Sequence, residues 1–153
     1  MSTKCQTLYL SGEYGKRASS SWRSLCQEAL KDVPHYVIIN PCLLDWNGPG
    51  SAGCFEHEVF ALGEADACVI YLMPEEDNSR ELLDLAFCVS RGQTVFFVCP
   101  SEHRHAAVTD LLLRGLETVH RFDTLEGLLG ALKLASGCLG AERGHSSAQS
   151  QTL

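Results

Sequence analysis

The acidic residues near the middle of this sequence are its main candidates for catalytic groups. Asp84 lies among leucines in the segment EEDNSRELLDLAF (75–87), which begins just after the apolar run ACVIYLM. Glu58 precedes that run, and Asp77 and Asn78 follow it closely. The segment either forms an ordinary amphipathic helix with a solvated acid, or it carries a reactive carboxylate into a cleft.

Helical spacing alone favours the first interpretation of Asp84. Polar or small residues recur at intervals of three and four, at Arg80, Glu81, Asp84, Cys88 and Arg91. Arg80 and Asp84 are four residues apart, which places two opposite charges side by side on a helix. From spacing alone we therefore expect this stripe to face solvent.

Two further motifs have a structural interpretation beside a functional one. Ser19–Ser21 offer N-cap oxygens to the helix predicted next, and the alternative is a phosphate cradle at that helix N-terminus. His103 and His105 form the motif HRH near Cys99. Two histidines at this spacing without a third ligand are typical of surface residues, so we predict no metal site.

The composition describes an ordinary globular chain with an excess of acid. Its 153 residues are 45% hydrophobic and 20% charged, which predicts one domain. With 12 Lys and Arg against 19 Asp and Glu, the formal net charge is -7. Nucleic-acid binding needs a basic surface, so we predict no nucleic-acid partner. We also predict no membrane partner, because no apolar run approaches the roughly 20 residues of a membrane-spanning helix.

The eight cysteines do not suggest a disulfide framework. No CxxC pair and no zinc-type Cys/His spacing occurs. Cys68, Cys88 and Cys99 lie within apolar runs, where a free cysteine behaves as a small hydrophobic residue. The first residues, MSTKCQTLYL, lack the apolar stretch of a signal peptide. We therefore expect free thiols and a cytoplasmic protein.

Strand-like and helix-like segments alternate along the chain. Short apolar or β-branched runs predict strands at 7–12, 35–40, 67–73, 94–100 and 118–122. Apolar residues at helical spacing predict helices at 19–32, 54–66, 80–92, 106–115 and 124–136. Gly92 stands where a helix commonly ends in left-handed backbone. The predicted domain spans 1–136, and the Gly-, Ser- and Gln-rich residues 137–153 are predicted to be a disordered tail.

This alternation predicts an α/β fold. Near-continuous apolar strands are typical of parallel sheets that helices cover on both faces. Five such strands suit a flavodoxin-like doubly wound fold with strand order 2-1-3-4-5. Open sheets of this kind bind ligands outside the carboxyl ends of the strands, here between the first and third strands. The loops SGEYGKRASSS (11–21) and PEEDNSR (74–80) meet at that place.

Missing motifs exclude several activities of doubly wound proteins. The first loop lacks the GxGxxG of dinucleotide sites and the GxxxxGK[ST] of P-loops. A phosphoacceptor aspartate is absent at the end of the third strand, where Leu72, Met73 and Pro74 stand. An FMN site of flavodoxin type needs a hydroxyl-rich first loop, which Ser19–Ser21 imitate only faintly. We expect no cofactor. A flavodoxin-like FMN protein remains as an alternative to this expectation.

Residues 7–100 resemble the nucleoside 2-deoxyribosyltransferase family. The similar segments are LYLSG (8–12), the NP and DW of INPCLLDW (39–46), the acid of FEHEVFAL (55–62) and EAD (64–66). The segment LLDLAFCVSRGQTVFFVCP (82–100) is similar to the family's L-E-L-G-x-A motif with its Gly turn and strand. The segments come in the family's order, and the interval from Asp66 to Asp84 needs no gap.

The resemblance implies an enzyme that cleaves the N-glycosidic bond of a nucleoside or nucleotide. In the family, a Glu attacks C1′, the base departs after protonation, and a second base or water resolves the glycosyl-enzyme, as in retaining glycosidases. Asp84 falls at the position of that nucleophile. Glu58 falls at the position of an acid that contacts the base. Asn78, with Asp77 beside it, falls where another acid transfers a proton.

The resemblance and the predicted loops together indicate the substrate-binding residues. Tyr9 matches an aromatic residue near the nucleophile. The full set of binding candidates is Tyr9, Ser11, Gly12, Tyr14, Ser19, Ser20 and Trp46. Family members assemble so that a neighbouring subunit completes the site, so the resemblance also implies a homo-oligomer.

Departures from the family pattern leave the reaction open. Asp84 is one methylene shorter than Glu, which withdraws the carboxylate by roughly 1.5 Å. Misplacement on that scale can cost about a hundredfold in rate. Ala86 replaces a Gly of the motif, and Asn78 replaces an acid. Glu13 and Tyr14 stand where an apolar aromatic is usual. The expected outcomes are deoxyribosyl transfer between bases, hydrolysis that releases the base, or a nucleotide- or ribose-binding relative without catalysis.

Overall fold

The computed structural model of the protein describes residues 5–11, 21–41 and 52–141, with backbone alone at residues 21, 52–56 and 136–141. Its strands are β1 Gln6–Ser11, β2 Tyr36–Ile39, β3 Ala67–Tyr71, β4 Thr94–Val98 and β5 Val119–Phe122. Its helices are α1 Ser21–Leu30, α2 Ala52–Glu64, α3 Ser79–Ser90, α4 Ala106–Leu113 and α5 Leu125–Ala141. The strands form one parallel sheet of order β2-β1-β3-β4-β5, which confirms the predicted doubly wound α/β fold.

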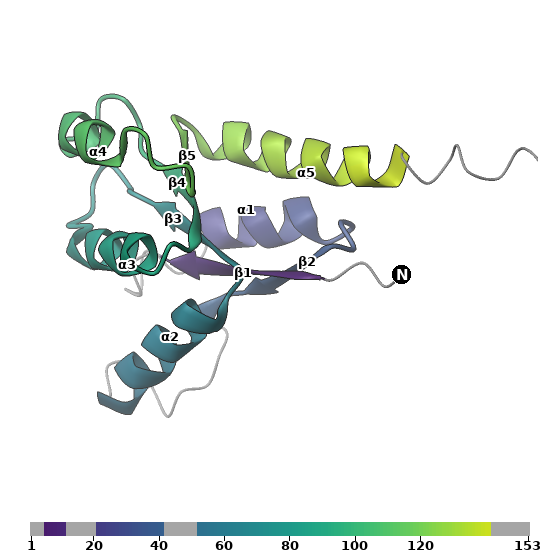
Figure 1. Ribbon diagram of the computed structural model, residues 1–153, viewed down its shortest axis with the longest axis horizontal. Coiled ribbons are helices and arrows are strands. Elements are labelled where there is room, and N and C mark those ends of the chain that lie inside the picture. The colour runs from purple at the N-terminus through teal and green to yellow at the C-terminus, as the bar shows by residue number, and fades with distance from the viewer. Residues whose placement is uncertain (1–4, 12–20, 42–51, 142–153) are drawn as a thin grey trace, which may run out of the picture.

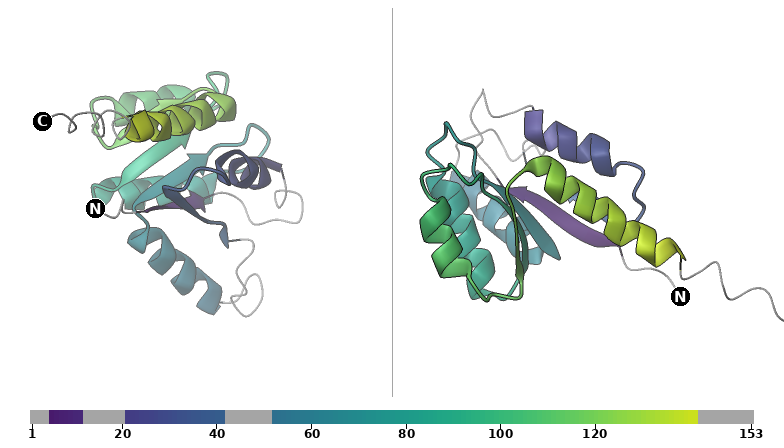
Figure 2. Two further views of the ribbon diagram at one scale, coloured as in Figure 1. Left: turned by 90° about the vertical axis from the view of Figure 1, so that its right-hand side faces the viewer. Right: turned by 90° about the horizontal axis from the view of Figure 1, so that it is seen from above.

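Helices cover the sheet on both faces, as Figures 1 and 2 show. α1 and α5 pack together on one face, where Trp22, Cys26 and Leu128 belong to one buried cluster. α2, α3 and α4 cover the other face, where Leu62 and Leu85 belong to a second cluster. With a helix layer on each side, the central strands have no wet face, which is why their sequences are apolar throughout.

β1 contributes to both clusters because neighbouring side chains on a strand point to opposite faces. Leu8 and Leu10 belong to the cluster under α1 and α5, whereas Tyr9 belongs to the cluster under α2, α3 and α4. Ser11, two residues after Tyr9, therefore points to the same face as Tyr9. The last residue of β1 thus presents a buried hydroxyl toward the layer that contains α3.

Local backbone chemistry sets both ends of α3. Asn78, which precedes the helix, has φ 54°, a left-handed conformation that Asn tolerates better than most residues. At the other end, Gly92 has φ 65° and its N–H donates to the Val89 carbonyl at 3.0 Å, while Gln93 N–H donates to the Cys88 carbonyl at 3.0 Å. This pair of bonds is a Schellman motif, so the predicted helix end at Gly92 is confirmed.

Most boundaries lie within one or two residues of the sequence prediction, and the end of α5 lies five residues beyond it. α2 begins at Ala52, two residues before the helix predicted at 54–66. α5 continues to Ala141, beyond the predicted domain boundary at 136. Its apolar residues Leu125, Leu128 and Leu132 are buried at helical spacing and anchor its first half, and Ala, Leu and Ser can extend the helix past that contact.

The cysteines of the described part are free: Cys5 is exposed, and Cys26, Cys68, Cys88 and Cys99 are buried. Burial raises the pKa of the Cys26 thiol to about 12. The pKa of the Cys68 thiol is likewise raised, first by burial and then by the neighbouring Cys88 and Asp84. Within the ranges that the structure covers, no helix is both long and apolar enough to cross a membrane.

Candidate active site

Asp84 lies against the carboxyl end of β1. Its Oδ2 accepts a 2.5 Å hydrogen bond from the Oγ of Ser11, a residue with no exposed surface. Asp84 itself is half-buried in the second turn of α3. Because β1 and β3 are the neighbours at which the strand order reverses, this contact lies at the switch point of the sheet. The structure thus brings two predicted site residues, Ser11 and Asp84, together at the predicted place.

The part of the stripe formed by Glu81, Asp84 and Cys88 faces the protein interior, so our expectation of a solvated face was wrong there, whereas Arg91 is exposed. Glu81 is 2% exposed, and it shares the inward face of α3 with Leu85 and Cys88 at the spacing of a core-facing stripe. By contrast, Leu83 is 70% exposed. The helix is turned so that its acids, and not only its leucines, face the sheet.

Glu81 is a site residue that the sequence analysis did not select. Burial raises its pKa most, and the nearby negative charge of Asp84 adds to that, while a backbone hydrogen bond at Glu81 and then Arg23 and Arg80 act in the opposite direction. Arg23 comes from α1 and is completely buried, and its Nε donates to the Leu10 carbonyl at 3.4 Å. The signal was present in the sequence, since Glu81 occupies an apolar position of the 81, 85, 88 repeat.

Glu58 reaches the same place from α2. It is buried and forms an ion pair with Arg80 of α3. Arg80 in turn lowers the pKa of Asp84, although burial is the larger influence and the net direction for Asp84 is upward. We use the name charged cluster for Arg23, Glu58, Arg80, Glu81 and Asp84, which three helices bring to the carboxyl end of β1.

Asn78 holds the loop between β3 and α3 and is 3% exposed. Its Oδ1 accepts from the Met73 N–H at 3.0 Å, and its Nδ2 donates to the carbonyls of Met73 and Glu76, each at 2.8 Å. His103, from the loop after β4, lies with Nε2 3.1 Å from the same Nδ2. These contacts occupy the Asn78 amide, so its geometry fits loop positioning and not the proton transfer that the resemblance implies.

Asp77 points away from the charged cluster. Its side chain is 81% exposed, and its carboxylate lies 3.6 Å from Arg104, whose Nη2 also donates to the Asp77 carbonyl at 2.8 Å. Asp77 and Arg104 therefore tie together the loops that follow β3 and β4. The predicted surface position of the HRH motif was wrong for His103, which is 6% exposed because it packs against Asn78.

Tyr9 is buried beneath α3, in the same apolar cluster as Leu85 and Cys88. It supports the helix that carries Asp84. The remaining predicted binding residues, Gly12, Tyr14, Ser19, Ser20 and Trp46, lie outside the described residues. Across 5–11, 21–41 and 52–141, no group of three or more His, Cys, Asp and Glu is arranged to hold a metal ion.

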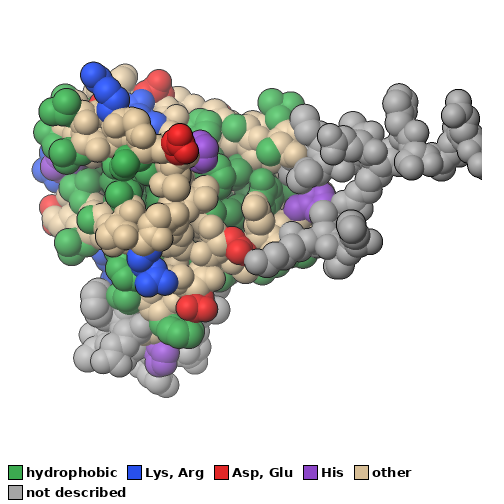
Figure 3. Space-filling model, viewed as in Figure 1, with side chains coloured by type: hydrophobic (Ala, Val, Ile, Leu, Met, Phe, Trp, Pro, Cys, Tyr) green, Lys and Arg blue, Asp and Glu red, His purple; other side chains and the backbone are tan. Residues whose placement is uncertain are grey.

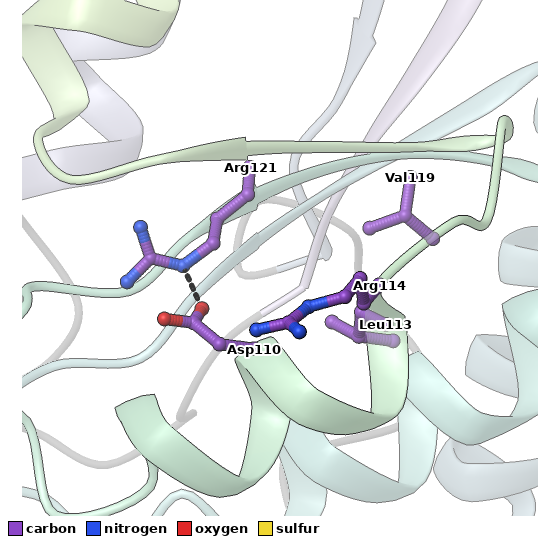
Figure 4. Close-up of a pocket in the computed structure, with 5 residues that line it drawn as sticks. All are labelled: Asp110, Leu113, Arg114, Val119 and Arg121. Atoms are coloured by element: carbon purple, nitrogen blue, oxygen red, sulfur yellow. Dashed lines mark ion pairs between the residues drawn. The ribbon is translucent and has the colours of Figure 1, made fainter.

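A shallow pocket of about 330 Å³ lies elsewhere, beside the edge strand β5. Figure 4 shows its lining residues, Asp110, Leu113, Arg114, Val119 and Arg121, with Arg121 paired to Asp110. Arg121 also donates to Asp123 at 2.7 Å, so its charge is already balanced. The surrounding surface is partly apolar, with Val108, Leu111 and Leu112 exposed on α4 (Figure 3). Neither feature adjoins the charged cluster.

The charged cluster can support carboxylate chemistry. A half-buried Asp with a fixed hydroxyl partner is oriented for nucleophilic attack, and a buried Glu one turn away can hold a proton. Comparison of the chain with known protein-family models and with curated proteins finds no match in either case.

Proposed function

We propose that this protein cleaves the N-glycosidic bond of a nucleoside or nucleotide through a covalent intermediate on Asp84. The observation that carries the proposal is the contact between Asp84 and Ser11 at the switch point of the sheet. It gives the carboxylate a fixed orientation at the place where open α/β sheets bind ligands. The resemblance of residues 7–100 to the nucleoside 2-deoxyribosyltransferase family supports the same reaction.

The reaction has two displacements at C1′ of the sugar. In the first, an Asp84 oxygen forms a bond to C1′ while the bond from C1′ to nitrogen breaks, and the base leaves with the electron pair and takes up one proton. In the second, water or another base attacks C1′, the ester bond breaks, and Asp84 returns as a carboxylate. Water gives hydrolysis, and a second base gives transfer.

Incubation with deoxynucleosides, ribonucleosides and their monophosphates, followed by chromatography for free base, tests this function. We expect base release by the wild-type protein and loss of at least a hundredfold with Asp84→Asn, since Asn is not a nucleophile. Asp84→Glu restores the missing methylene and is expected to retain or increase the rate. Absence of release and of base exchange in both wild type and Asp84→Glu would contradict the proposal.

A nucleotide- or ribose-binding protein without catalysis is the second candidate. The observation that favours it is the burial of Asp84, which raises its pKa and disfavours the charged form that a nucleophile needs. Thermal stabilisation by nucleotides separates the two functions. In a binding protein it accompanies intact substrate and survives Asp84→Ala. In an enzyme, products accumulate and Asp84→Ala abolishes their formation.

A further inference from the structure

Among the described residues at the site, charge is unequal in sign when every group is ionised. The charged cluster then has two cations, Arg23 and Arg80, and three anions, Glu58, Glu81 and Asp84. An unbalanced charge is costly in a buried environment, and the usual remedy is that one acid keeps its proton. One proton on the cluster makes its net charge zero.

Glu81 is better placed than Asp84 to keep that proton. It is almost completely buried, whereas Asp84 is half-buried and receives the Ser11 hydroxyl, which favours a carboxylate as acceptor. Glu58 is paired with Arg80 and therefore favours its charged form. Burial raises the pKa of Glu81, and the negative charge of Asp84 adds to that effect.

We propose that Glu81 is the proton-holding partner of Asp84: it supplies the proton that the departing base takes up, directly or through water. The inference rests on the proposed function. In the first displacement, Asp84 becomes an ester and loses its negative charge. Glu81 gives its proton to the departing base and gains a negative charge. In the second, the attacking water gives a proton to Glu81 as Asp84 becomes a carboxylate again. The cluster therefore stays neutral through both steps.

The coupling between the two acids explains when the proton moves. While Asp84 is ionised, its charge holds the proton on Glu81. When Asp84 forms the ester, that charge disappears, and Arg23 and Arg80 then favour the ionised form of Glu81. Glu81 becomes a stronger acid at the moment when the leaving base needs a proton.

Leaving-group dependence distinguishes a proton donor from a structural residue. An ordinary deoxynucleoside needs protonation of its base, whereas 7-methyl-2′-deoxyguanosine already carries a positive charge and its base departs without a proton. We expect Glu81→Gln to lower base release from deoxyguanosine by about 10²–10⁴-fold and to lower release from the methylated substrate much less. Gln has the shape of protonated Glu, so the fold is retained. Glu81→Asp keeps an acid and should restore part of the lost rate.

Glu126→Gln, at an exposed acid in the first turn of α5, is the matched control and should change neither rate. Equal losses on both substrates in Glu81→Gln would overturn the proposal in favour of a structural role.

If the wild type releases neither base, that result contradicts the proposed function instead. In that case a carboxyl ¹³C NMR titration of the ligand-free protein still tests the pair. If the wild type titrates in two coupled steps and Asp84 of Glu81→Gln titrates in a single step, the two acids share a proton. If the titration of Asp84 is the same in both proteins, the proposal is refuted.

Discussion

Ser11 Oγ lies 2.5 Å from Asp84 Oδ2, although 73 residues separate the two in the chain. The bond joins the last residue of β1 to the second turn of α3, and it fixes one carboxylate oxygen at the end of the sheet. It also opposes the effect of burial, because a hydroxyl that donates to a carboxylate stabilises the charged form and lowers the pKa of Asp84. Ser11 therefore orients the proposed nucleophile and favours its ionised form against the larger effect of burial.

Removal of that hydroxyl in Ser11→Ala is expected to lower kcat/KM for base release about tenfold to a hundredfold. This loss corresponds to about 1.5–3 kcal/mol, which is what a hydrogen bond to a charged group contributes. The pKa of Asp84 rises without its donor, so the acid limb of the pH–rate profile should move to higher pH. Ser90→Ala, which removes an exposed hydroxyl at the end of α3, is the control. A Ser11→Ala profile that keeps the wild-type acid limb would show that the bond does not set the ionisation of Asp84.

Asp84→Asn is expected to stabilise the protein while it abolishes activity. The raised pKa of Asp84 means that the folded state binds its proton more tightly than the unfolded state does. Asp84 therefore favours folding below its ordinary pKa near 3.9, and that advantage is lost as pH rises through the raised value. Urea denaturation across a pH series should show the free energy of unfolding of the variant rising relative to that of wild type over this window. Asp32→Asn, at an exposed turn after α1, should show no such gain.

The positions of the helices and strands could be predicted because each left a periodic signal of its own. The run ACVIY reads as a buried strand, and the residues around Leu85 and Cys88 read as a helix that ends at Gly92. The doubly wound order follows from the alternation of these elements. The place of the candidate site, at the carboxyl ends of β1 and β3, follows from the order alone.

The charged cluster could not be predicted in the same way, because its balance depends on groups from three helices. Helical spacing made Arg80 and Asp84 a surface pair, since nothing local indicates that Arg23 of α1 and Glu58 of α2 converge on α3. Spacing also could not show that the Asn78 amide bonds to Met73 and Glu76, because those bonds depend on the conformation of the loop between β3 and α3.

Asn78 supports α3 in two separable ways, and substitution can separate them. Asn78→Gly keeps the positive φ without strain but loses the side-chain bonds, each worth about 1 kcal/mol. Asn78→Ala loses the same bonds and adds a left-handed strain of about 1–2 kcal/mol. The free energy of unfolding, measured with urea, should therefore fall in the order wild type, Asn78→Gly, Asn78→Ala. Equal stability of the two variants would mean that the backbone conformation at residue 78 carries no cost.

His103 should make the contact between the two loops sensitive to acid. His105 N–H donates to His103 Nδ1 at 3.1 Å, which places the single proton of the neutral ring on Nε2, beside Asn78 and the Met73 backbone. A second proton on Nδ1 removes that acceptor. It also adds a positive charge near Arg104 and His105, which the nearby Glu102 offsets only in part. Burial is the main reason that the pKa of His103 is lowered.

A lowered pKa means that the unfolded state binds the proton more readily, so the contribution of His103 is complete above its ordinary pKa near 6.5 and is lost as pH falls through the lower folded value. We expect wild type to lose unfolding free energy in this window. His103→Ala should start lower at neutral pH and lack that loss, whereas His120→Ala, at an exposed position on β5, should keep it. Faster amide exchange in residues 73–78 at mild acid would locate the opening at this loop. An identical pH slope in wild type and His103→Ala would assign the acid sensitivity to another group.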